Sequence, residues 1–387
     1  MTALRRCTLI VNPSRSWIRY RALMRKLRRT ELGRVVVTRD RDHLVRVVEA
    51  FLREKDCGEV DGEGRPGRCA CLLVYGGDGT IHHVLTTLYR RSPERTADVR
   101  VGFLRGGSGN GYHDSYGVPR LLKAQLRTLG RSLDLGLDVP VDLLRVESGG
   151  QVVYGQMAGV GFDAEVLKRR ERSAGGRTPS PGMLRYVLSG AGALFDGAGD
   201  LQREWDIRLE GARTEPGVPG KAREGARPAA AGAADSRVER RMRTVQIEMA
   251  KREFYGNGFR ICPGARPTGG TQEVFLFAPR KPLGVLAALP LLWTGNHRWI
   301  NRLRGGSRPV ERYRACITRI RATGPFGYHV DGELMQSRGQ EGDHSLVVSV
   351  VPQAVRFLVP ERFYGRLMGA SGRSTSGAGY RDRPPVM

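Results

Sequence analysis

Hydrophobic and polar residues alternate in two different ways along the chain, and the change comes near residue 138. Before it, the short apolar runs 7–11, 34–38 and 71–75 are separated by stretches such as 17–29, whose apolar residues have helical spacing. The runs predict buried strands, and the spaced stretches predict amphipathic helices. Strands that alternate with helices in this way predict a parallel sheet with helices on both faces.

Beyond residue 138, apolar and polar residues alternate one by one, as in VDLLRVES, EWDIRLEG and HSLVVSVVP. A period of two between Gly/Pro-rich turns predicts an antiparallel sandwich or barrel. The expected fold class is therefore α/β plus all-β, with a Rossmann-like parallel α/β domain followed by an antiparallel β-sandwich-like domain.

The same patterns predict the domain limits. We expect the two domains at 1–138 and 139–365, with one helix at 181–195. The segments at about 211–236 and 370–387 lack apolar periodicity, which predicts a disordered insertion and a disordered tail.

Three polar loops directly follow predicted strands: NPSRS, GGDGT and RGGSGN. In a parallel sheet, the carboxyl ends of the strands meet at one edge, which is where ligands bind. Glycines let backbone N–H groups approach phosphate oxygens, and a helix after GGDGT adds its positive N-terminal end. Asp78 in this loop can bind Mg²⁺ or accept a proton from an attacking hydroxyl. A plain strand-to-helix turn capped by Asp78 is the alternative.

The net charge of +25 on 387 residues favours polyanionic partners, which include nucleic acid, an anionic membrane surface and phosphorylated ligands. Solvated arginines that reflect coding bias are an equally open explanation. No nucleic-acid-binding module is recognisable, so no specific nucleic-acid partner is expected.

Two further features bear on the compartment. The six cysteines show no paired framework and no C-x-x-C, which favours reduced thiols in a cytoplasmic protein. The longest apolar run, 283–293, is about half of a membrane span and contains Pro290, so any membrane contact is expected to be peripheral. The segment LLWTGNHRWINRLRG fits either a membrane interface or a core helix with a basic end.

In this order, the motifs VNPS, VYGGDGTIHHV, GFLRGGSGNGYHDSYGVP, VGFDAEVLKRRE and HVDGEL resemble the diacylglycerol kinase catalytic-domain superfamily. That group includes bacterial lipid kinases, sphingosine kinases and ceramide kinases. The resemblance spans residues from about 7 to 360. It implies an N-terminal nucleotide domain, a C-terminal lipid domain, and ATP and Mg²⁺ as cofactors. The implied activity is transfer of the γ-phosphate of ATP to the hydroxyl of a diacylglycerol-like or sphingoid lipid.

The resemblance also implies a role for each matching residue. Asp78 would be the catalytic carboxylate, as base or magnesium ligand, and Asp331 a second metal contact. Asp163 and Glu165 would meet the lipid head group. The nucleotide would be contacted by a larger set, which comprises Asn12, Ser14, Thr38, Gly76, Gly77, Gly79, Thr80, Gly107, Ser108, Gly109, Asn110, Arg185 and Glu333. Further candidate phosphate contacts are Arg169 and Arg170.

Three residues depart from the family pattern. Arg15 stands where the family usually has glycine, Arg105 where it often has proline, and His82 where asparagine is common. None of these changes removes Asp78 or the glycine loops, so we expect an active kinase that is peripherally associated with an anionic membrane surface. An NAD kinase-like enzyme with a soluble substrate and a nucleotide-binding pseudokinase are the alternatives. The oligomeric state is open, with a homodimer as one possibility.

Overall fold

The computed structural model describes most of the chain. The described residues are 2–13, 17–27, 32–54, 71–96, 98–107, 109–173, 203–214, 236–256, 258–279, 282–303, 309–340 and 342–371. The predicted helix 181–195 lies outside them, as do 215–235 of the predicted insertion and 372–387 of the predicted tail.

The N-terminal half is built on parallel strands in the order β4-β3-β1-β2. Their bounds are β1 Cys7–Val11, β2 Arg34–Val37, β3 Cys71–Gly76 and β4 Arg100–Arg105. Each strand is followed by one or more helices, namely α1 Trp17–Leu27, α2 Arg41–Glu54, α3 Asp78–Arg91 with the short α4 Pro93–Thr96, and α5 Gly111–Ser115 with α6 Leu122–Asp134. A 3₁₀ turn, Thr2–Arg6, precedes β1. The strand–helix alternation predicted from the sequence is confirmed.

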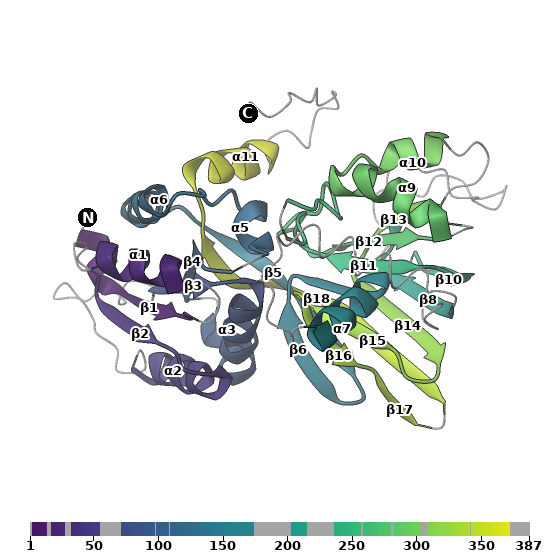
Figure 1. Cartoon of the computed structure of the whole chain (residues 1–387), viewed down its shortest axis with the longest axis horizontal. Helices are drawn as coiled ribbons and strands as arrows, with labels where there is room; N and C mark the ends of the chain where they lie inside the picture. Colours follow the sequence, from purple (N-terminus) through teal and green to yellow (C-terminus); the bar gives the residue numbers. More distant parts are fainter. Residues whose placement is uncertain are drawn as a thin grey trace.

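The helices cover both faces of this sheet, as Figure 1 shows. Leu72 and Val74 of β3 face α2 and α3, whereas Leu73 and Tyr75 face α1 and α6. Because β3 is buried on both faces, its sequence is an uninterrupted apolar run.

The C-terminal half is a sandwich of two antiparallel sheets. The smaller sheet has the order β16-β15-β7-β11-β12-β13-β9, with bounds Glu333–Gln336, Gly327–Val330, Met157–Gly161, Gln246–Ala250, Gln272–Phe277, Val310–Ala315 and Arg213–Thr214. The facing layer contains β5 Asp138–Ser148, β6 Gln151–Gly155, β8 Glu204–Glu210, β10 Val238–Arg243, β14 Ile317–Thr323, β17 Arg338–Gln340 and β18 Asp343–Leu358. Val160 and Ile247 of the smaller sheet share one core with Ile207 and Ile320 of the other.

One long strand, β18, belongs to both halves. Its first part pairs antiparallel with β14, and Arg356 and Phe357 near its end pair parallel with β4. The sheet therefore runs without a break from β2 to β10, a connection that the sequence patterns did not predict. After β18, helix α11 (Glu361–Ser371) returns to the N-terminal half, where Phe363 lies against Tyr116.

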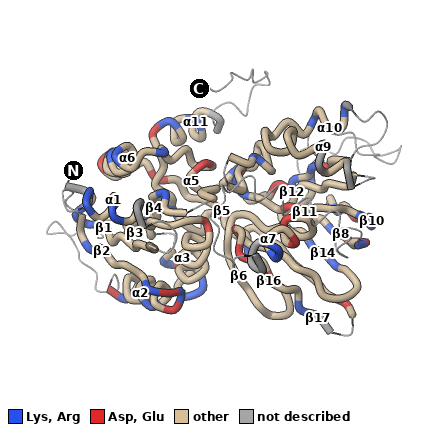
Figure 2. Tube along the Cα trace, in the orientation of Figure 1, with Lys and Arg blue, Asp and Glu red and all other residues tan. Residues whose placement is uncertain are grey.

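Helices α9 (Pro282–Trp293) and α10 (His297–Leu303) cover the outer face of the smaller sheet. Val285, Leu292 and Ile300 are buried against Phe275 and other apolar residues of that sheet, which supports the core-helix alternative for this segment. Among the described residues, no helix is both long and apolar enough to cross a membrane. In Figure 2, Lys and Arg positions are spread over both halves, so their distribution does not by itself mark a binding face.

Candidate active site

The two glycine loops lie in contact at the carboxyl ends of β3 and β4. A Cβ atom on Gly107 would lie 2.2 Å from Cα of Gly77, and one on Gly77 would lie 2.9 Å from Cα of Gly107. The N–H group of Gly106 also donates a hydrogen bond to the carbonyl oxygen of Gly76, at 3.0 Å. Because side chains do not fit between the loops, the two loops present one continuous surface of backbone.

Asp78 ties the first loop to the second. It is the first residue of α3, and its carboxylate accepts hydrogen bonds from the N–H groups of Gly111 and Tyr112, both at 2.9 Å. These two groups begin α5, so Asp78 caps the neighbouring helix rather than α3, whose N-cap is Gly77. Burial raises the pKa of Asp78, although Arg252 and the two N–H groups partly oppose that rise.

Two further predicted nucleotide residues also lie at the first loop. Asn12, just after β1, donates from Nδ2 to Oγ1 of Thr80 at 2.9 Å. A Cβ atom on Gly76 would lie 2.6 Å from Cβ of Thr80, so the glycine leaves room for this threonine. Thr38 is buried at the end of β2, where its hydroxyl donates to the carbonyl oxygen of Val11 at 3.2 Å, so it joins strands β1 and β2.

Asn110 shapes the second loop. Its backbone is left-handed, with φ of 56°, and its amide donates to the carbonyl oxygen of Gly107 at 2.8 Å. It also forms an isolated bridge with Gly256 of the C-terminal half. A Cβ atom on Gly109 would lie 2.9 Å from Oδ2 of Asp78, so the second loop closes over that carboxylate. Ser14, Ser108 and Arg185 lie outside the described residues.

Glu333 reaches the first loop from the C-terminal half. It begins β16, and a Cβ atom on Gly79 would lie 2.0 Å from its Oε1. Its Oε2 is 3.9 Å from Nε2 of His83, and 43% of the side chain is exposed. The structure thus brings the HVDGEL segment to GGDGT, although more than 240 residues separate them along the chain.

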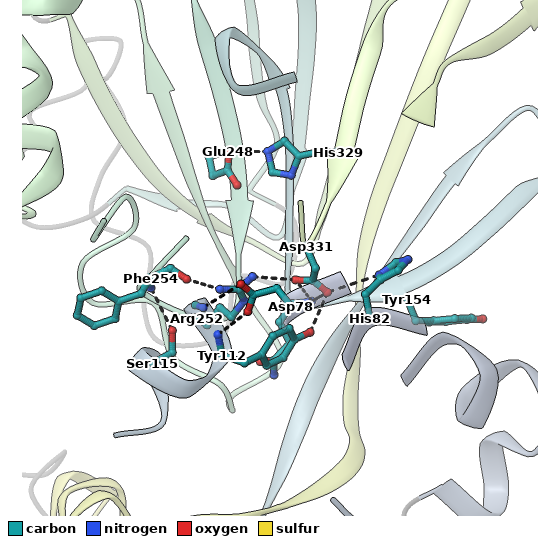
Figure 3. A network of polar contacts seen from close by, with 12 residues as sticks. Asp78, His82, Tyr112, Ser115, Tyr154, Glu248, Arg252, Phe254, His329 and Asp331 are labelled. Carbon is teal, nitrogen blue, oxygen red and sulfur yellow. Dashed lines mark hydrogen bonds and ion pairs between the residues drawn. The ribbon is translucent and has the colours of Figure 1, made fainter. Parts of the chain in front are cut away.

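Asp331 is buried, and Figure 3 shows the side chains that contact it. Its carboxylate accepts hydrogen bonds from the Tyr112 hydroxyl at 2.8 Å, from the Gln156 N–H at 3.2 Å and from Arg252 Nη2 at 3.2 Å. His82 Nδ1 is a further 3.6 Å contact. Burial alone would raise the pKa of Asp331, but His82, Arg252 and Tyr112 together lower it.

Arg252 is a residue that the sequence analysis missed. It follows β11, is buried, and stacks on Tyr112 with its guanidinium carbon 4.4 Å from the ring centroid. It also donates to the carbonyl oxygen of Phe254, and its charge acts on both Asp78 and Asp331. A Cβ atom on Gly111 would lie 2.3 Å from its Nη1. The signal in the sequence was the basic pair KR, placed between a strand and the turn residues YGNG.

The residues predicted to meet the lipid lie on α7 (Phe162–Ser173). Asp163 is buried and accepts a hydrogen bond from Gln246 Nε2 at 3.1 Å. Glu165 forms ion pairs within its own helix, with Lys168 and Arg169, both at 3.6 Å. The side chain of Arg170 lies outside the described part of the chain.

The departure at Arg105 has a structural explanation. Its guanidinium donates to the carbonyl oxygens of Val118 and Pro119 and forms an ion pair with Asp114 at 2.7 Å. These contacts fasten the segment after the second glycine loop. The arginine therefore stabilises the conformation of the chain next to the loop.

Comparisons with known proteins identify the family of the chain. The profile of the diacylglycerol kinase catalytic domain matches residues 7–145, and that of the YegS C-terminal NAD kinase beta sandwich-like domain matches 157–359, more than half of the chain. The chain belongs to the diacylglycerol kinase family. Both the predicted family and the predicted fold class, with its α/β and β-sandwich-like parts, are thereby confirmed.

Among relatives, a probable lipid kinase YegS-like protein of Klebsiella pneumoniae (strain 342) is 31% identical over 126 residues. That match covers 33% of this chain and 36% of the relative, so it spans about a third of the relative's length. A diacylglycerol kinase of Mycobacterium tuberculosis (strain H37Rv) is 23% identical over 294 residues, which is 75% of this chain and 76% of that protein.

Among solved structures, a putative diacylglycerol kinase from Bacillus anthracis str. Sterne has a TM-score of 0.57 at 14% identity. The match covers 94% of this chain and 98% of that one. At this level of identity the likeness concerns the fold.

Proposed function

We propose that this member of the diacylglycerol kinase family is an ATP-dependent lipid kinase, which transfers the γ-phosphate of ATP to a hydroxyl of a diacylglycerol-like or sphingoid lipid. The observation that carries the proposal is the contact between the two glycine loops, which leaves a backbone surface with Asp78 beside it. A turn alone has no need for a second glycine loop so close that a Cβ atom on Gly107 would lie 2.2 Å from Cα of Gly77. A polyphosphate does, because its oxygens bind backbone N–H groups.

The nucleotide fits this surface. Gly77, Gly79 and Gly107 lack the side chains that would keep phosphate oxygens away from the backbone. α3, a helix of 14 residues, begins within this loop, so its N-terminus adds a partial positive charge there. Asn12, which follows the adjacent strand β1, supports the loop through its hydrogen bond to Thr80, so we assign this pair to positioning the loop.

Mg²⁺ fits next to Asp78 and Glu333. Both carboxylates lie at the first loop, one at the start of α3 and the other over Gly79. When bound, the ion would neutralise charge on the transferred phosphoryl group. Asp331 fits this role less well, because three hydrogen-bond donors and His82 surround its carboxylate. We therefore assign Asp331 to positioning Arg252 and Tyr112.

In this proposal Asp78 accepts the proton of the lipid hydroxyl. The N–H groups of Gly111 and Tyr112 hold its two oxygens in a fixed orientation. Its raised pKa moves the carboxylate towards the range in which a general base is effective near neutral pH. The lipid itself would come from a membrane, and the net charge of +25 supports attraction to an anionic bilayer by a peripheral, cytoplasmic enzyme.

The test is a phosphotransfer assay with γ-labelled ATP and Mg²⁺. The protein is incubated separately with vesicles that contain diacylglycerol, sphingosine or ceramide, and with NAD in solution. We expect label on one of the lipids. Label on NAD alone, or ATP binding without transfer to any acceptor, would contradict the proposal and favour the NAD kinase-like or pseudokinase alternative.

A further inference from the structure

A second polar cluster lies inside the C-terminal half, apart from Asp78. Glu248 of β11 and His329 of β15 are both register partners of Gly159, which lies on the strand β7 between them. A Cβ atom on Gly159 would lie 2.2 Å from Oε2 of Glu248 and 2.5 Å from Nε2 of His329. The glycine therefore leaves the space in which the two side chains meet across three adjacent strands.

Asp163 of α7 completes this cluster. One ligand-type atom from each of Asp163, Glu248 and His329 lies within 4.8 Å of the other two, and all three residues are buried. Gln246 orients both carboxylates, because its Nε2 donates to Asp163 at 3.1 Å and to Glu248 at 2.7 Å. Its Oε1 accepts the N–H of Asp163 at 3.0 Å. Supporting hydrogen bonds of this kind are typical around metal ligands.

Several buried polar atoms of the cluster have no hydrogen-bond partner. Both nitrogens of His329 and Oε1 of Glu248 are buried without a hydrogen-bond partner. The nearest approach is the 3.5 Å ion-pair contact between His329 Nε2 and Glu248 Oε2. Within the described part of the chain, no Lys or Arg forms an ion pair with Glu248. Two ionised carboxylates buried beside one imidazole are strongly unfavourable unless a proton or a cation neutralises part of their charge.

We propose that Asp163, Glu248 and His329 bind a divalent transition-metal ion of the Zn²⁺ or Mn²⁺ type. One imidazole with two carboxylates suits these ions, whereas Mg²⁺ and Ca²⁺ favour sites made only of oxygen ligands. The ion would fasten the start of α7 to β15, the strand that leads into Asp331 and Glu333. This site is separate from the proposed nucleotide magnesium and does not depend on the kinase activity.

The experiment uses Co²⁺ as a spectroscopic probe and the full-length protein, first stripped with a chelator. We expect one Co²⁺ per chain, visible absorption bands of a low-symmetry site, and displacement by Zn²⁺. Glu248→Gln and His329→Gln should each weaken Co²⁺ binding by about tenfold or more, since each removes a ligand. His297→Gln is the matched control, because His297 is also buried with both ring nitrogens unpartnered. It should bind Co²⁺ like the wild type.

Two outcomes would overturn the proposal. One is a wild-type protein that takes up no Co²⁺, or whose uptake survives in both Glu248→Gln and His329→Gln. The other is uptake that is lost in Asp78→Asn but kept in Glu248→Gln, which would place the ion at the glycine loops. If both ligand variants fail to fold, anomalous scattering from crystals of the wild type with Zn²⁺ decides. A peak between Asp163, Glu248 and His329 supports the site, and peaks only elsewhere contradict it.

Discussion

Asp78 and Asp331 are two carboxylates that interact with the same arginine, Arg252, yet their environments shift their pKa values in opposite directions. The pKa of Asp78 is raised, mainly by burial, whereas hydrogen bonds and the charges of His82 and Arg252 lower that of Asp331. Above the ordinary carboxyl pKa, ionised Asp78 therefore reduces stability, and ionised Asp331 increases it. A carboxylate whose ionisation lowers stability is a candidate for a functional role, whereas one whose ionisation raises stability has a structural role.

The largest expected effect separates these roles directly. Asp78→Asn should lower kcat for lipid phosphorylation by about 10²- to 10⁴-fold, the range typical of a general base. Its free energy of unfolding should change by no more than about 1 kcal/mol, because loss of one N–H hydrogen bond is offset by removal of a buried charge. Steady-state kinetics and urea unfolding measure the two effects. Full activity of the Asp78→Asn variant would show that Asp78 takes no part in the chemical step.

The second prediction concerns the buried ion pair. Arg252→Met should lower the free energy of unfolding by about 3–5 kcal/mol, because it leaves the buried carboxylate of Asp331 without its guanidinium partner. The double variant Arg252→Met/Asp331→Asn should recover part of this loss, since it removes the unpaired charge as well. Urea unfolding of the single and double variants tests this. A double variant less stable than Arg252→Met would show that the pair does not act as described.

A smaller effect compares two buried tyrosines. Tyr112 donates to charged Asp331 and Tyr116 to the neutral side chain of Gln156, each at 2.8 Å. Tyr112→Phe should lower the free energy of unfolding by about 1.5–3 kcal/mol, and Tyr116→Phe by only about 1 kcal/mol. Equal losses in the two variants would indicate that Asp331 is not ionised in the folded protein.

The smallest effect concerns the exposed partner of the loop. Glu333→Gln should raise KM for ATP by about fivefold, because the proposed contact of Glu333 with the Mg²⁺ of the nucleotide is lost. One partly exposed charge contributes about 1 kcal/mol to such binding. Stability should not change. Glu361→Gln is the matched control, because Glu361 is also a partly exposed glutamate and its partner, Arg131, lies away from the glycine loops. Similar KM values for wild type and Glu333→Gln would exclude Glu333 from the ATP site.

The glycine loops were predictable because their signal is local. Gly76–Thr80 and the RGGSGN segment stand directly after apolar runs, so their meeting at one sheet edge follows from the parallel arrangement. Arg252 was not predictable in this way, since it meets Asp331 only through a contact across 79 positions of the chain. That β18 pairs with strands of both halves could not be predicted for a similar reason, because its residues alternate as in any sandwich strand.

The cluster around Gly159 shows the same limit. Glu248 and His329 become neighbours only through the register of three strands, and no sequence motif predicts their contact. Asp163 was identified through a resemblance to lipid-binding stretches, and its contacts with Gln246 could not be read from that pattern. Local spacing thus reveals loops and strands, whereas non-local register decides which polar groups share a buried site.

The central claim is that the contact between Gly77 and Gly107 forms the ATP site. The most direct measurement is ATP binding by calorimetry to Gly107→Ala and to its control Gly365→Ala, whose new methyl group would meet no atom within 4 Å. We predict that Gly107→Ala binds ATP at least about tenfold more weakly while remaining folded by circular dichroism, and that Gly365→Ala binds like the wild type. A folded Gly107→Ala protein with wild-type ATP affinity would contradict the claim.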